Sequence, residues 1–171
     1  MTALVVDASA ALTLLRGEPG AAEAGRHLRE QLLADEPVLV PALFWLEVVN
    51  VLAHRFRLRP DAIVEAVYEL EYAGLTTVEV GRPATLAVID AIGRSGLTAY
   101  DAAYLVLSES TDARLLTTDA ALAAAAGDRA VLVGGTDGIA EPAATYTPDR
   151  SWTTWIGAVA YLAELRRAVQ P

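Results

Sequence analysis

Short apolar runs alternate with longer stretches of helical periodicity along most of the chain. Five runs have the length and composition of strands: 3–6, 38–40, 76–80, 114–117 and 130–133. Between and after them the apolar spacing predicts seven helices: 9–16, 21–34, 42–56, 60–73, 82–94, 99–110 and 119–126. Such alternation is typical of a parallel sheet with helices on both faces, so we expect an α/β fold.

Turn and capping residues bound several of the predicted helices. Ser9 follows the first strand and is placed to cap the helix that comes next. The segment Gly17-Glu18-Pro19-Gly20 separates the first two helices, and Pro60 suits the first turn of a later one.

The pattern changes at Gly134. Residues 134–151 are rich in Gly, Pro and acidic side chains, which is typical of a linker. Beyond them, large apolar residues fall on one stripe of a predicted helix: Trp152, Trp155, Ile156, Val159, Leu162, Ala163 and Val169. We therefore expect one domain over 1–133, and a linker with a C-terminal amphipathic helix over 134–171.

Composition excludes several kinds of chemistry. The 171 residues contain no cysteine, so disulfides, thiolate metal sites and cysteine nucleophiles are ruled out. All 13 basic residues are arginine, which removes Walker-type phosphate loops, Schiff bases, and the receiver domains and dehalogenase-like phosphatases that need a lysine. With only His27 and His54, a three-histidine zinc site cannot form, and we expect both histidines at the surface.

Two features indicate a soluble protein of the cytoplasm. The N-terminal segment lacks a cationic leader and reaches an acid at Asp7, unlike a signal peptide. No apolar stretch reaches the roughly 18 uninterrupted residues that span a bilayer, and the best, Val38 to Ala53, is short and contains Glu47 and Asn50. We expect no contact with a membrane.

Four carboxylates stand out by position. Asp7 and Asp119 follow the first and fourth strands, at the sheet edge where α/β proteins bind ligands. Glu47 lies in an apolar helix and Asp101 in the first turn of another. An ionised carboxylate in apolar surroundings is costly unless it is paired or binds a cation, and the chain has no lysine. The set therefore favours a hard divalent cation such as Mg²⁺.

Each acid also has an ordinary interpretation. Asp7 could simply end a strand, Asp119 could cap a helix, and Asp101 could favour a helix dipole. Glu47 is harder to explain in this way, because its helical neighbours are apolar. One acid alone is a weak signal, whereas four on one edge of a sheet are a much stronger one.

Four sequence blocks carry a resemblance to a known family. They are Val5-Val6-Asp7-Ala8-Ser9-Ala10, the helix 46–52 around Glu47, the segment 97–104 around Asp101, and Leu116-Thr117-Thr118-Asp119. In this order and spacing they resemble the PIN-domain nucleases, and within them most closely the VapC toxins of bacterial toxin–antitoxin pairs. The resemblance covers about residues 1–133 and leaves the C-terminal segment without a counterpart.

The resemblance implies a PIN-like parallel sheet and an endoribonuclease that depends on Mg²⁺ or Mn²⁺. It implies that Asp7, Glu47, Asp101 and Asp119 are both the catalytic residues and the metal ligands. Ser9 and Thr117 would be supporting polar residues. It further implies RNA as substrate, a cognate antitoxin as partner, a homodimer, and products with a 5′-phosphate and a 3′-hydroxyl. The alternative is a catalytically inactive PIN-like module that binds RNA or a protein.

The residue types suit this chemistry independently of any family. Phosphodiester hydrolysis needs an activated water and neutralisation of charge on the phosphoryl oxygens, and a carboxylate-held Mg²⁺ supplies both. A second ion about 4 Å away could stabilise the leaving oxygen, and the sequence leaves one or two ions open. No lysine or histidine is then required as general base.

The net charge of −9 opposes nucleic-acid binding, and the chain stays acidic even without the four proposed ligands. RNA must therefore meet local arginines, of which Arg55, Arg57 and Arg59 form the densest cluster. One interpretation is that these three arginines lie at a helix C-terminus, where cations favour the helix dipole. The other is that they contact RNA or an acidic antitoxin segment. We expect Tyr100 and Tyr104 in the core rather than stacked on bases.

Overall fold

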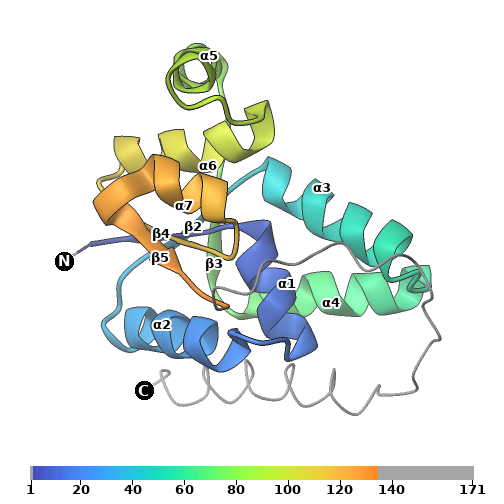
Figure 1. The fold of residues 1–171 in the computed structure, drawn as a ribbon. Helices are drawn as coiled ribbons and strands as arrows, with labels where there is room; N and C mark the ends of the chain where they lie inside the picture. Colours follow the sequence, from blue (N-terminus) through green and yellow to red (C-terminus); the bar gives the residue numbers. More distant parts are fainter. Residues whose placement is uncertain (1, 135–171) are drawn as a thin grey trace.

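The computed structural model describes residues 2–134 and contains one five-stranded parallel sheet (Figure 1). Its strand order is β3-β2-β1-β4-β5. The strands are β1 (Leu4–Val6), β2 (Val38–Pro41), β3 (Leu75–Val78), β4 (Arg114–Thr117) and β5 (Ala130–Leu132). Every residue of β1 and β2 is buried, as a strand with helices on both faces requires. The predicted α/β fold is therefore confirmed.

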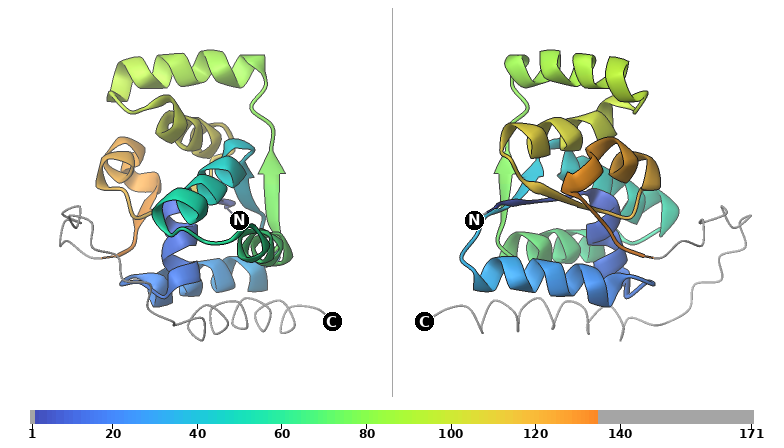
Figure 2. Two further views of the ribbon diagram at one scale, coloured as in Figure 1. Left: turned by 90° about the vertical axis from the view of Figure 1, so that its right-hand side faces the viewer. Right: turned by 60° about the vertical axis from the view of Figure 1, so that its left-hand side comes forward.

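Helices cover both faces of this sheet (Figure 1). They are α1 (Ala8–Arg16), α2 (Ala21–Leu33), α3 (Leu43–Asn50), α4 (Pro60–Tyr72), α5 (Arg82–Ser95), α6 (Ala99–Ser110) and α7 (Ala120–Ala126). A π-helical segment η1 (Val51–Arg55) continues α3, and a 3₁₀ turn η2 (Gly127–Arg129) follows α7. Helices α6 and α7 lie on one face, while α1, α2 and α4 lie on the other (Figures 1 and 2).

Two predicted elements differ from the structure by more than one residue at an end. The helix expected over 42–56 is α-helical only to Asn50, and its last turns are the π-helix η1, in which the Phe56 amide donates to the Val51 carbonyl at 3.1 Å. The strand expected over 76–80 is β3, which begins at Leu75 and ends at Val78. It ends there because its partner β2 ends at Pro41, which pairs with Val78.

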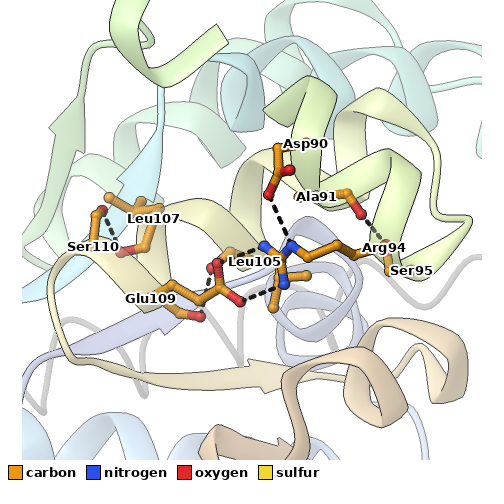
Figure 3. Close-up of polar contacts among 9 residues, drawn as sticks. Asp90, Ala91, Arg94, Ser95, Leu105, Leu107, Glu109 and Ser110 are labelled. Atoms are coloured by element: carbon orange, nitrogen blue, oxygen red, sulfur yellow. Dashed lines mark hydrogen bonds and ion pairs between the residues drawn. The ribbon is translucent and has the colours of Figure 1, made fainter. Parts of the chain in front are cut away.

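Helix α5 lies outside α6, farther from the sheet than the other helices (Figure 2). Only Val88 and Ala91 of α5 are buried. Arg94 of α5 donates to Asp90 at 3.0 Å on its own helix and to Glu109 of α6 at 3.1 Å (Figure 3). Exposed ion pairs add little stability, so α5 is held mainly by its apolar contact with α6.

After β5 the chain crosses the loop between α1 and α2. A Cβ atom on Gly20 would lie 2.5 Å from the Gly134 nitrogen, so only glycine permits this close approach. Of the linker and C-terminal helix expected over 134–171, only Gly134 is among the described residues. The division of the chain at 133/134 stays a prediction. None of the helices within residues 2–134 is both long and apolar enough to cross a bilayer.

Candidate active site

The site lies at the topological switch point of the sheet, between β1 and β4. From β1 the chain leads to β2 on one side, and from β4 it leads to β5 on the other, while β1 and β4 are neighbours. Asp7 follows β1, and its amide donates to the Leu116 carbonyl of β4 at 3.0 Å. Asp119 follows β4 by two residues. This point at the carboxyl edge is the usual ligand position of an open α/β sheet.

One cavity of about 240 Å³ at this edge is lined by all four predicted acids: Asp7, Glu47, Asp101 and Asp119. They come from four different places in the chain: the end of β1, helix α3, helix α6 and the start of α7. Ser9 and Arg55 line the same cavity. Thr117 is not among its lining residues and is fully buried beside Asp7.

Asp7 is the most deeply buried of the four, with 6% of its surface exposed. Its Oδ2 accepts hydrogen bonds from the hydroxyls of Ser9 and Thr117, the latter at 2.8 Å. Burial raises the pKa of the Asp7 carboxyl above its usual value, and the two hydroxyls oppose this shift because they stabilise the charged form. Both predicted supporting residues therefore contact Asp7 directly.

The expectation that Ser9 caps the first helix is wrong. Helix α1 begins at Ala8, which puts Asp7 at the N-cap position and Ser9 inside the first turn. The strand passes into the helix with no intervening loop, so the Ser9 hydroxyl faces the Asp7 carboxylate instead of the helix amides. Ser9 Oγ also accepts a hydrogen bond from the Thr118 amide at 3.1 Å, linking the ends of β1 and β4.

Glu47 has a partner that the sequence did not reveal. The hydroxyl of Tyr104 in α6 donates to Glu47 Oε2. Burial raises the pKa of the half-buried Glu47 carboxyl, the charges of Asp7 and Asp101 raise it further, and the tyrosine hydroxyl lowers it. Burial and the neighbouring carboxylate also raise the pKa of Tyr104, so its hydroxyl keeps its proton.

The two tyrosines of α6 differ from each other. Tyr104 is fully buried, as expected for a core residue, and it belongs to the site as well. Tyr100 is 63% exposed, so the expectation that it lies in the core is wrong. It lies in the first turn of α6, where Thr98 and Ala99 are exposed too. The sequence signal that could have identified Tyr104 as a site residue is its position three residues after Asp101, because residues at this spacing lie on one helix face.

The remaining two acids occupy helix starts. Thr98 caps α6: its hydroxyl accepts from the Asp101 amide at 3.2 Å and donates to Asp101 Oδ2 at 2.7 Å. Asp119 caps α7, because its Oδ1 accepts from the amides of Ala121 at 2.7 Å and Leu122 at 2.9 Å. The ordinary interpretation of Asp119 as an N-cap is therefore correct, and it holds alongside its place in the cavity wall.

The donor chemistry of the cavity fits a divalent cation such as Mg²⁺, because it consists of carboxylate oxygens. Glu47, Asp101 and Asp119 each use one carboxylate oxygen for a protein donor, and the other accepts no hydrogen bond from any residue the structure describes. In their present rotamers, no three His, Cys, Asp or Glu side chains within residues 2–134 have the geometry to hold a metal together. A site with three such ligands would therefore require side-chain movement, whereas Mg²⁺ can also be held by one or two carboxylates and water.

The three clustered arginines have different surroundings. Arg55 ends η1 and lines the cavity, whereas Arg57 and Arg59 do not. Arg59 pairs with Asp61 at 2.5 Å. His54, beside the cluster, is exposed as expected, while His27 on α2 is partly buried, which lowers its pKa.

Two further residues near the cavity have no sequence signal. Glu18, in the loop between α1 and α2, lines the cavity and accepts from Arg16 Nε at 2.6 Å. The Arg16 guanidinium lies 3.7 Å from the centroid of the Phe56 ring. These contacts join segments that the sequence pattern treats as separate.

Comparisons with known proteins agree with this architecture. The family model described as PIN domain matches residues 4–128. The crystal structure of PAE2754 from Pyrobaculum aerophilum superposes with a TM-score of 0.58 at 23% identity, over 75% of this chain and 83% of that one. At this identity the likeness concerns the fold alone. No curated protein matches the chain.

Proposed function

Because this chain belongs to the PIN-domain family, whose members are generally nucleases, we propose that it is an endoribonuclease dependent on Mg²⁺ or Mn²⁺. One observation carries the proposal: four carboxylates from four separate elements line one cavity at the carboxyl edge of the sheet. A structural role alone does not require acids to gather in this way, because like charges in a shared cavity repel each other.

The proposed ligands of the cation are Asp7, Glu47, Asp101 and Asp119. A bound divalent cation would supply an activated water and neutralise charge on the phosphoryl oxygens. The hydroxyls of Ser9 and Thr117 orient Asp7 and favour its charged form. Tyr104 orients Glu47, so donors from β4, α1 and α6 hold two of the four acids, Asp7 and Glu47.

The finer assignment concerns biological role. We propose that the protein is the toxin of a type II toxin–antitoxin pair that acts on RNA in the cytoplasm, forms a homodimer and is bound by a cognate antitoxin. The four motif blocks and their order support it, since they resemble the VapC toxins most closely. A short neighbouring reading frame for a small DNA-binding protein would support this role directly.

The test compares single charge removals in the full chain. Asp7→Asn and Asp101→Asn keep side-chain volume but remove a ligand charge, so we expect each to abolish cleavage of a labelled RNA in Mg²⁺ or Mn²⁺. The control is Asp61→Asn, an exposed acid on α4 that does not line the cavity. Circular dichroism checks that every variant is folded. Wild-type cleavage rates in either site variant would contradict the proposed ligand set.

A second candidate function is a PIN-like module that binds RNA or protein without cutting it. The observation in its favour is that the cavity acids do not form a metal-holding group as they stand within residues 2–134. Titration calorimetry with Mn²⁺ separates the two functions. Absence of binding, together with retained affinity for RNA, would favour the non-catalytic module.

A further inference from the structure

Arg55 is the single cation in the wall of the acidic cavity, as far as the structure describes that wall. Five acids line the same cavity: Asp7, Glu18, Glu47, Asp101 and Asp119. Arg55 nevertheless forms no ion pair with any carboxylate of residues 2–134, although arginines elsewhere in the domain do. Arg55 is exposed, and its guanidinium, which carries five N–H donors, forms no hydrogen bond with any described residue.

The backbone places Arg55 in line with Glu47. In an α-helix, residues four apart drift by about 40° around the axis. Two such α-helical steps from Glu47 would rotate position 55 around the helix axis, away from the cavity. The second step here is the π-helix η1, whose wider turn reverses the drift. As a result, Glu47, Val51 and Arg55 all line the cavity.

Phe56 provides a rigid support for Arg55. Its ring is 9% exposed, and Arg16 and Arg55 lie 3.7 Å and 5.6 Å from its centroid, both within cation–π range. The charge of Arg16 is matched by Glu18 at 2.6 Å, whereas that of Arg55 has no such partner among the described residues. Of the two cations on this ring, Arg55 is thus the one available to an anion.

The neighbouring arginines lack these features. Arg57 follows the end of η1 with a positive φ of 52° and does not line the cavity. Arg59 precedes α4 and pairs with Asp61. The dense basic cluster in the sequence therefore contains one cavity cation and two that lie outside the cavity wall.

We infer that Arg55 is the phosphate-binding residue of this cavity and contacts a backbone phosphate of a single RNA strand next to the phosphate that meets the acids. The inference rests on the proposed function and deepens it. An RNA strand brings negative charge to five acids, and an unpaired guanidinium in the same wall offsets that repulsion and offers paired N–H donors. Recognition of this kind is independent of base sequence.

The experiment measures binding as well as cleavage. Full-length Arg55→Gln and Arg57→Gln are made in the Asp101→Asn background, and their affinity for a fluorescent single-stranded RNA is measured by anisotropy at several salt concentrations. We expect Arg55→Gln to weaken binding roughly tenfold. Its log–log salt slope should fall by about 0.7, the value for one phosphate contact on a single strand. Arg57→Gln should stay within about twofold of its parent.

A conservative variant and a kinetic arm complete the test. Arg55→Lys keeps the charge but loses the planar pair of donors, so it should restore the salt slope and only part of the affinity. With an intact Asp101, Arg55→Gln should raise KM more than it lowers kcat. Equal effects of Arg55→Gln and Arg57→Gln on binding, or no RNA binding by the parent, would overturn the inference. Failure of the wild type to cleave RNA, with the Arg55 binding effect retained, would overturn the proposed nuclease function alone.

Discussion

The hydroxyl of Tyr104 can be removed from the site without changing a charge or the packing of a large side chain. Tyr104 is fully buried, and its hydroxyl donates to Glu47 Oε2. Tyr104→Phe keeps the ring in the core and removes one hydrogen bond to a carboxylate. Bonds of this kind contribute about 1.5–3 kcal/mol. Glu47 is only half-buried, so water can replace part of the lost contact, and the lower end of this range applies.

We therefore expect the free energy of unfolding to fall by about 1.5 kcal/mol in Tyr104→Phe, since water compensates part of the loss. For a protein of this size, this corresponds to a Tm lower by roughly 4–6 °C. Urea unfolding and calorimetry measure both quantities. RNA cleavage should fall as well, because Glu47 loses the donor that orients it.

The same helix offers a matched control. Tyr100 is 63% exposed, four residues earlier in α6, and the structure gives its hydroxyl no hydrogen bond within residues 2–134. Tyr100→Phe should leave Tm unchanged within error. Repeating Tyr104→Phe in a Glu47→Ala background completes a double-mutant cycle, in which most of the loss should disappear. If Tyr104→Phe is as stable as Tyr100→Phe, or if its cost is the same without Glu47, the reasoning is refuted.

Three other outcomes follow from the same contacts. Burial raises the pKa of the Asp7 carboxyl above 3.8 in the folded state. Ionisation of this carboxyl therefore destabilises the fold as the pH rises from 3.8 through the pKa of the folded state. In urea unfolding without divalent cations, Asp7→Asn should exceed the wild type in stability at neutral pH, by a margin that shrinks on acidification; a less stable variant at neutral pH would contradict this. Mg²⁺ or Mn²⁺ should raise the wild-type Tm and raise that of Glu47→Gln far less, whereas equal shifts would place the cation elsewhere. Thr98→Ala should cost about 1 kcal/mol in urea unfolding through loss of the α6 cap, and Thr98→Ser should recover most of it; an unaffected Thr98→Ala would rule out the cap.

The sequence alone determined the class of fold and the edge at which the acids lie. Strand and helix periods are local properties, so alternation of short apolar runs with helical stretches is readable before any packing is known. The positions of Asp7 and Asp119 follow from the same pattern, because Asp7 comes directly after an apolar run and Asp119 comes two residues after another. Parallel strands end at a common edge, which the sequence predicts, and the structure adds that β1 and β4 are neighbours, so the two acids lie near each other.

Only the tertiary structure decided which groups hold those acids. Tyr104 and Glu47 are 57 residues apart, and Thr117 and Asp7 are 110 apart, so no local spacing predicts either hydrogen bond. The sequence predicts that Ser9 caps the first helix. Its hydroxyl donates to the Asp7 carboxylate instead, because no loop separates β1 from α1.

The arginine cluster gives the sharpest contrast between the two levels. In the sequence, Arg55, Arg57 and Arg59 are equivalent cations at alternate positions. In the fold, a π-helical turn directs only Arg55 to the cavity wall. The direction of a side chain at a helix end depends on the local winding and on what the next turn packs against. Apolar periodicity indicates which face of a helix is buried, but it does not indicate whether the last turn is α-helical or π-helical.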